Sequence, residues 1–238
     1  MTVQDEVEPL REKDTDYQGE GLRTSEFLLF YDIAFLRFKE LLEYSMKQRE
    51  AAENTEKQNN NKRIMMTSAE VIIFATMALE SCANCIIRDH GKSEELRRSE
   101  DLKNKSTLYK KWHFIIHQII GEIQIGDTFL QILDMVVKKR HKMTHAIPQK
   151  IEVLTNQSRM MFISSNKNGP TIQLAVNAIH AYHLLEEICN KLPVRAYYPK
   201  FDTLSWMNND SAHLNNSLKA LGYEPFFLVR EMETVIEI

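Results

Sequence analysis

The sequence predicts an all-α protein: an antiparallel bundle of four to five helices with a small mixed α/β extension at its C-terminal end. Apolar side chains recur at three- and four-residue spacing in several segments, which places them on one face of a helix. Glycine and proline are scarce, at 7 and 6 of 238 residues, which argues against a loop-rich β-sandwich. With 43% apolar residues, the chain is long enough to bury one sizeable core.

Three regions of different character follow one another along the chain. Residues 1–20 hold seven acidic and two basic side chains and no apolar run, so we expect residues 1–23 to form a flexible acidic tail and no signal or transit peptide. Residues 24–192 carry the helical patterns and form the expected bundle. Pro193 opens residues 193–238, the expected C-terminal extension.

The first two helices are predicted from their apolar stripes. One spans Thr24 to about Arg49, and the other spans about Thr67 to Asp89, where Gly91 follows as a helix stop. Between them, the polar run 58–61 predicts a break in helical structure. The stripe of the first helix consists of Leu28, Tyr31, Phe35, Phe38 and Leu42.

Three more helices and a hairpin complete the expected bundle. A charged connection over 92–105 leads to a helix over 108–120, which ends at Gly121, and the next helix runs from Asp127 to about His145, before Pro148. The β-rich runs 150–154 and 160–164 predict a small hairpin within 150–164. The last helix of the bundle is expected over 174–192.

The basic end of the fourth helix carries residues with catalytic chemistry. Arg140 and His145 stand in an Arg-x4-His spacing, and His141 directly follows the arginine. Arginine stays charged and can hold two phosphate oxygens, whereas histidine transfers protons near neutral pH. Since RNA supplies its own nucleophile, the 2′-OH, these two groups suit cleavage of its phosphodiester bond. The neighbouring cations that would attract the RNA backbone are Lys138, Lys139 and Lys142.

This helix resembles the signature helix of HEPN domains, whose motif is Arg, a polar residue, three variable residues and His. The resemblance rests on the run Phe129-x-x-Ile132-Leu133-x-x-Val136-Val137-x-x-Arg140-His141-x-x-x-His145. The segment 78–84, with Glu80 and Asn84, is similar to the Glu/Asn-bearing helix that precedes it in many such proteins. Leu108-Tyr109-Lys110-Lys111-Trp112 resembles the Lys-Trp segment between those helices. The resemblance covers about residues 25–192 and leaves residues 193–238 without a counterpart.

The resemblance implies a metal-independent endoribonuclease without a cofactor, often a toxin or host-defence effector. It also implies a homodimer with the two motifs facing each other, RNA as the substrate, and an antitoxin or regulatory protein as a possible partner. On this reading His145 is the general acid or base, Arg140 is the phosphate clamp and His141 assists. The residues expected to bind substrate are Lys138, Lys139, Lys142, Glu80 and Asn84. The alternative is a non-catalytic helical module of the same fold that binds a protein or a nucleic acid.

Helical geometry also favours a dimer. Residues five positions apart, such as Arg140 and His145, point about 140° apart, whereas His141 and His145 differ by about 40°. Arg140 and His145 can meet on one phosphate if the arginine reaches round or the helix loosens at its end. A homodimer avoids the difficulty, because each chain can supply one of the two groups.

Several plainer explanations stand beside the catalytic one. Cations stabilise a helix C-terminus without any ligand, Arg140 and His145 could form a structural ion pair or surface cluster, and Glu80 with Asn84 could be a polar pair that satisfies the bundle interior. Cys82-x-x-Cys85 falls within an apolar helix and is expected to pack in the core. Four C-terminal aromatic residues could stack on bases, form a small core or bind a partner; these are Trp206, Tyr223, Phe226 and Phe227.

A metal site is the less favoured reading of the histidines. His113/His117 and His141/His145 have the i, i+4 spacing of metal ligands, and His180, His183 and Glu187 could add others. A metallohydrolase helix would carry a glutamate between the second pair, where this chain has Lys142 and Met143. The His113/His117 pair is expected to flank the packed face formed by Trp112, Ile115, Ile116 and Ile119.

The amino-acid composition limits which cellular compartment and which partners we expect for the protein. Three cysteines cannot form a disulfide framework, so we expect a reducing, cytoplasmic environment. A net charge of −3 confines any contact with nucleic acid to a local basic patch. The longest apolar run, 71–79, is shorter than the roughly 20 residues that a membrane-spanning helix needs, so no membrane association is expected.

Overall fold

The computed structural model describes residues 26–92, 106–121, 124–144, 153–156, 159–162, 171–192 and 205–227. These residues are mostly helical, which confirms the all-α class. The expected acidic tail, most of the charged connection 92–105, and His145 lie outside the described residues.

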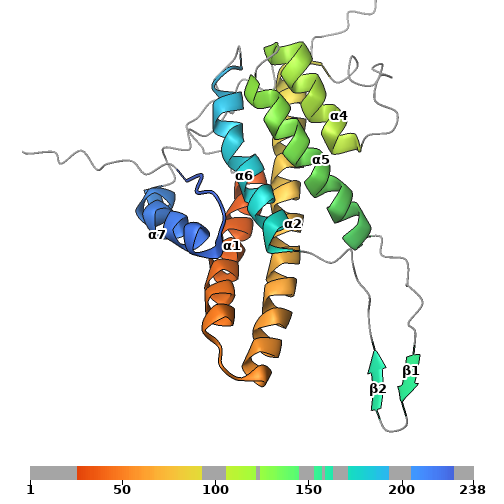
Figure 1. Ribbon diagram of the computed structural model, residues 1–238. Coiled ribbons are helices and arrows are strands. Elements are labelled where there is room, and N and C mark those ends of the chain that lie inside the picture. Colours follow the sequence, from red (N-terminus) through yellow and green to blue (C-terminus); the bar gives the residue numbers. More distant parts are fainter. Residues whose placement is uncertain are drawn as a thin grey trace, which may run out of the picture.

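The first two helices form a long antiparallel pair, the most extensive contact between elements of the described chain (Figure 1). They are α1 (Glu26–Glu50) and α2 (Asn54–Asp89). Tyr31, Phe35, Phe38 and Leu42 of α1 are buried, as the stripe predicts, and Leu28 is partly buried. The apolar periodicity of α1 therefore identified the face that packs into the bundle.

The predicted break over 58–61 is wrong, because α2 is continuous from Asn54 and the connection is confined to residues 51–53. Packing against the end of α1 explains the difference. The Arg63 guanidinium lies over the ring of Tyr44, 5.2 Å from its centroid, and Asn60 is 7% exposed. A polar sequence can thus remain helical where a neighbouring helix supplies the contacts.

Helix α2 lies at the centre of the bundle and contacts α1, α4, α5 and α6. By length and composition alone its segment 54–88 could cross a membrane, but 56% of the most apolar window is buried within the protein. Its apolar residues are therefore explained to a large extent by helix packing. The core helix of a soluble protein can have the same length and composition.

The other helices of the bundle are α4 (Thr107–Phe114), α5 (Gln124–Thr144) and α6 (Ile172–Cys189). The predicted helix 108–120 is α-helical only to Phe114 and continues as the π-helix η2 (Ile115–Ile120). Ser106 begins α4, since its side chain accepts a hydrogen bond from the Tyr109 backbone N–H at 3.2 Å. Gly121 ends η2 with φ of 96°, a value that favours glycine.

The predicted hairpin is confirmed, at slightly shifted positions. Strand β1 (Val153–Asn156) pairs antiparallel with β2 (Arg159–Phe162), so that Val153 lies opposite Phe162. Figure 1 shows the hairpin projecting away from the helices beyond the end of α5.

In the extension expected to be mixed α/β, the described residues 205–227 contain helix α7 (Ser205–Leu221) and an irregular segment, without a strand. Helix α7 packs against α1 (Figure 1). Lys39 of α1 forms an ion pair with Asp210, and the Arg49 guanidinium donates to the carbonyls of Ala220 and Leu221. Because Arg49 satisfies carbonyls at the end of α7, it both caps that helix and joins it to α1.

The segment after α7 covers an aromatic part of the core. Phe227 is 4% exposed, and its ring lies 5.9 Å from Phe35 and 6.2 Å from Phe38, between ring centroids. The Asn215 side chain holds the segment, donating to the Phe227 carbonyl at 2.7 Å and accepting from its N–H at 3.1 Å. Core packing is therefore the observed role of Phe227 among the alternatives for the C-terminal aromatic residues. The core in question belongs to the main bundle and is not a separate one.

A histidine is enclosed beneath this segment. His183 of α6 lies 4.6 Å from Phe227 and 5.5 Å from Phe226, between ring centroids. Its Nε2 is 3.1 Å from the hydroxyl of Tyr31. Burial, and to a lesser degree the neighbouring His180, lowers the pKa of His183 from 6.5 to about 3.

Acid is therefore expected to destabilise the fold through His183. Between its ordinary pKa near 6.5 and its folded value near 3, the unfolded chain binds a proton that the folded chain excludes. The contribution of His183 to the free energy of unfolding is then fully present above about pH 6.5. It falls as the pH drops, and the loss is about 1 to 3 kcal/mol at pH 4.5. Urea unfolding at pH 7.5 and pH 4.5 measures this loss.

His183→Gln provides the matched control for that prediction, since glutamine cannot take up the proton. The variant should lose less stability between pH 7.5 and pH 4.5 than the unmodified protein. An equal loss in both proteins would show that His183 does not cause the acid sensitivity.

Candidate functional site

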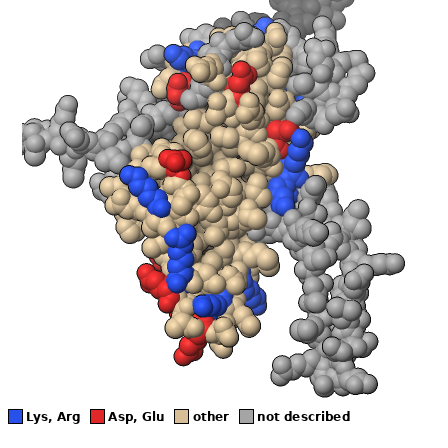
Figure 2. All heavy atoms as spheres, viewed as in Figure 1, with Lys and Arg blue, Asp and Glu red and all other residues tan. Residues whose placement is uncertain are grey.

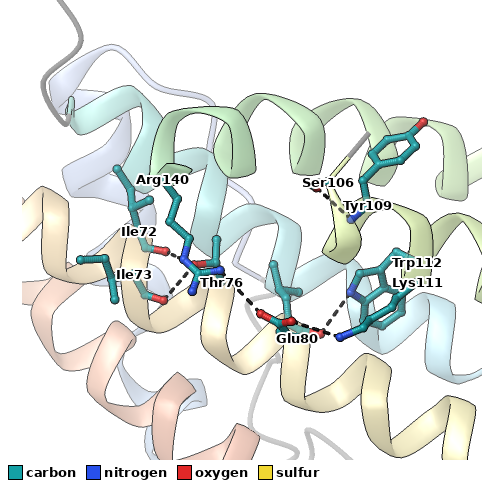
Figure 3. Close-up of polar contacts among 10 residues, drawn as sticks. Ile72, Ile73, Thr76, Glu80, Ser106, Tyr109, Lys111, Trp112 and Arg140 are labelled. Carbon is teal, nitrogen blue, oxygen red and sulfur yellow. Dashed lines mark hydrogen bonds and ion pairs between the residues drawn. The ribbon is translucent and has the colours of Figure 1, made fainter. Parts of the chain in front are cut away.

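Two of the residues predicted to form the site meet in an ionic cluster between three helices. Arg140 Nη1 of α5 lies 3.6 Å from Oε2 of Glu80 on α2. Lys111 Nζ of α4 lies 3.1 Å from Oε1 of the same carboxylate. Figure 3 shows Arg140 extending toward Glu80 from one side and Lys111 approaching it from the other. We call Glu80, Lys111 and Arg140 the ionic cluster.

A buried tryptophan fixes the position of Lys111. Trp112 is fully buried and its Nε1–H donates to the Leu79 carbonyl at 3.1 Å, which joins α4 to α2 next to Glu80 (Figure 3). The Trp112 ring also contacts Phe129 of α5 edge to face, with centroids 5.0 Å apart. The three helices that supply the ionic cluster are therefore held together directly beneath it.

The ionic cluster places two cations on one carboxylate and remains partly open to solvent. The exposed fractions of the Lys111, Arg140 and Glu80 side chains are 16%, 28% and 34%. Partial burial strengthens the attraction of such a group for an anion relative to a fully solvated cation. Its composition therefore suits binding of a single phosphate or carboxylate group.

Helix α5 continues without interruption to Thr144, and His145 lies beyond the described residues. The helix stays regular to Thr144, and the end at which it was expected to loosen lies outside the described residues. His141 is exposed, as expected for a residue about 100° from Arg140 around the helix.

The other residues predicted to bind substrate are Asn84, Lys138, Lys139 and Lys142. Asn84 is exposed one turn beyond Glu80, and Lys139 is partly exposed on α5. Lys138 Nζ bonds to Asp134 Oδ2 at 2.6 Å, an i, i+4 pair within α5. The side chain of Lys142 lies outside the described residues.

Lys111 is a site residue that sequence reasoning missed. Its segment resembles a family feature, yet the residue was not among the expected binding groups. The missed signal is the adjacent tryptophan, because a fully buried Trp112 forces its neighbour to the edge of the helix interface.

The histidines proposed as metal ligands have other surroundings. His183 contacts the Tyr31 hydroxyl, His180 stacks on Phe226 with centroids 4.8 Å apart, and Glu187 is exposed. His113 and His117 lie 4.2 Å apart between centroids and flank the packed face of Trp112, Ile115 and Ile116 as predicted. No group of three or more His, Cys, Asp or Glu side chains in the described ranges could hold a metal ion.

Acidic and basic side chains alternate across the face drawn in Figure 2 and do not form a broad field of one sign. This pattern agrees with the small negative net charge of the chain. An anion would be bound on this face by a local arrangement such as the ionic cluster, and not by general attraction.

Neutralising Glu80 should destabilise the fold. In Glu80→Gln, two partly buried cations lose the carboxylate between them, so we expect the free energy of unfolding to fall by about 1 to 2 kcal/mol, less than for a fully buried pair. Urea unfolding measures the change. Glu70→Gln is the control on the same helix, because the Glu70 pair with Arg37 at 3.1 Å is 40% and 43% exposed. A loss no larger than that of the control would contradict the prediction.

Comparisons with protein-family models, with curated proteins and with solved structures find no match for this chain.

Proposed function

We propose that the protein is a metal-independent endoribonuclease of HEPN type, acting as a toxin or a host-defence effector. The ionic cluster is the observation that carries the proposal. Arg140, from the helix that resembles the family's signature helix, is held beside Lys111 by one carboxylate at a partly exposed position. A scissile phosphate needs a cation of this kind in the transition state.

The proposed reaction is an internal transfer at one phosphodiester bond. A base removes the proton of the 2′-OH, whose oxygen attacks the adjacent phosphorus. The bond from phosphorus to the 5′-oxygen then breaks, and that oxygen takes up a proton. The products are a 2′,3′-cyclic phosphate and a 5′-OH. His145 is proposed to transfer protons, Arg140 to stabilise the charged phosphorane, and His141 to assist.

Glu80 is proposed as a positioning residue for Arg140. A carboxylate at 3.6 Å limits the directions in which the long guanidinium side chain can point. Holding the cation in place before substrate arrives avoids the cost of ordering it during the reaction. Lys111 supplies a second positive charge on the other oxygen of Glu80.

A homodimer is proposed to complete the site. Arg140 points toward α2, and His145 follows a helix that stays regular to Thr144, so His145 of one chain would serve Arg140 of the other. Sedimentation of the purified chain tests the dimer.

The function is tested by incubating the purified protein with single-stranded RNA in EDTA. We expect cleavage that persists in the chelator and yields cyclic phosphate and 5′-OH ends. Cleavage should disappear in His145→Ala, while circular dichroism shows the variant to be folded. Intact RNA under all conditions, or cleavage that requires a divalent cation, would refute the proposal.

A non-catalytic binding module is the second candidate, and one observation favours it. Arg140 already forms an ion pair with Glu80, as a structural arginine would. In that case the protein would bind RNA or a protein partner without cutting RNA. RNA that shifts in a gel but stays intact, with equal binding by His145→Ala, would favour this candidate.

A further inference from the structure

A partly open hollow lies on another side of the α4–α5 contact. Its volume is about 310 Å³, at the lower end of the range for small-molecule sites. Apart from Leu130, which is 4% exposed, its walls are polar. These walls consist of Tyr109, His113 and His117 from α4 and η2, and Asp127, Gln131 and Asp134 from α5.

Helical geometry separates this hollow from the ionic cluster. Positions two apart on a helix point about 200° apart, so Tyr109 and His113 face away from Lys111. Gln131 and Arg140 are nine positions apart on α5, which corresponds to about 180°. Figure 3 shows the Tyr109 ring directed away from Glu80. The hollow is therefore a separate site, and its occupant need not be the scissile phosphate.

One wall of the hollow is a row of aromatic side chains. Tyr109 and His113 are stacked with centroids 6.1 Å apart, and His113 and His117 lie 4.2 Å apart with their ring planes tilted by 41°. The π-helix η2 begins directly after Phe114 and carries His117, so the row of rings runs from α-helical into π-helical backbone. Short π-helical segments are frequent at functional sites. A wall of rings favours a flat ligand, because a planar base can stack, with an offset, on the face of an aromatic side chain.

The facing wall is acidic. Asp127 and Asp134 contribute carboxylates and Gln131 an amide. Asp127 is exposed, whereas Asp134 also binds Lys138 at 2.6 Å. Carboxylates accept hydrogen bonds only, so the ligand must present donors along its edge. Guanine presents two adjacent donors, N1–H and N2–H₂, which match the two oxygens of one carboxylate, whereas adenine lacks this pair.

We propose that the hollow between α4/η2 and α5 binds a guanine base, which stacks on the ring of His117 and donates to the carboxylate of Asp127. The small volume admits the base, and the sugar and phosphate lie outside. The base can belong to a free guanine nucleotide or to an unpaired guanosine of an RNA strand. The proposal stands apart from the ribonuclease activity.

Calorimetric titration of the full chain with GMP and AMP tests the site. GMP should bind at least about tenfold more tightly than AMP, since only guanine pairs with the carboxylate. In Asp127→Asn this preference should disappear, with AMP binding unchanged. In His117→Ala both nucleotides should bind more weakly, because stacking does not distinguish the bases.

Two further experiments distinguish the sources of the base and test whether the hollow is independent of the ionic cluster. Short single-stranded RNA with one guanosine in an adenosine background should compete with GMP if the base comes from RNA, and fail to compete if the site takes free nucleotide only. Arg140→Ala should leave GMP binding unchanged, whatever its effect on RNA cleavage. Equal binding of GMP and AMP, or no binding of either, would overturn the proposal.

Discussion

Arg140→Ala should lower the rate of RNA cleavage by about 100- to 1,000-fold, the usual cost of removing one group that stabilises charge in the transition state. The fold should be retained, because the Arg140 side chain is 28% exposed and Glu80 keeps its bond to Lys111. Single-turnover cleavage of a labelled RNA measures the rate, and urea unfolding should change by less than about 1 kcal/mol.

Two matched variants on the same helix sharpen this prediction. Arg140→Lys keeps the charge but cannot hold two oxygens at once, so an intermediate loss of about tenfold is expected. Lys138→Ala removes a nearby cation whose side chain is 64% exposed and paired with Asp134. Its effect should stay within about threefold and shrink as salt is added. If Lys138→Ala and Arg140→Ala reduce cleavage equally, Arg140 acts through general attraction and the proposed role is wrong.

Trp112→Ala should be the most destabilising single change at the junction of α2, α4 and α5. The side chain is fully buried, packs against Phe129 and donates to the Leu79 carbonyl. Losing the ring leaves a cavity and an unsatisfied carbonyl, so the free energy of unfolding should fall by about 3 to 5 kcal/mol. Urea unfolding followed by circular dichroism measures the loss.

Trp112→Phe separates the two contributions to that loss. It keeps an aromatic ring in the core but removes the N–H that bonds to Leu79, so a smaller cost of about 1 to 3 kcal/mol is expected. If Trp112→Ala cost less than about 1 kcal/mol, the tryptophan could not be what holds Lys111 in place.

Residues whose surroundings follow from their own helix were predicted well. The α1 stripe of Tyr31, Phe35 and Phe38 is buried, because a 3.6-residue period puts these side chains on one face whatever that face meets. The hairpin was also found, at Val153–Asn156 and Arg159–Phe162, since its strand-forming residues are adjacent in the chain.

Features that need a second helix were missed. Residues 58–61 were predicted to break the helix, yet contacts with the end of α1 keep them helical. Residues 205–221 were not recognised as a helix, and carbonyls at their C-terminal end are capped by Arg49, more than 150 residues earlier. Local propensity does not include such long-range contacts.

The amino-acid sequence by itself determined the helical class, the apolar faces and the basic end of α5, because these depend on spacing along one chain segment. Only the tertiary structure decided that Glu80 meets Arg140 while Asn84 stays exposed, and that Lys111 joins them. The physical reason is that the ionic cluster depends on how α2, α4 and α5 pack around Trp112. The direction of a side chain across an interface is fixed by that packing, which no single helix contains.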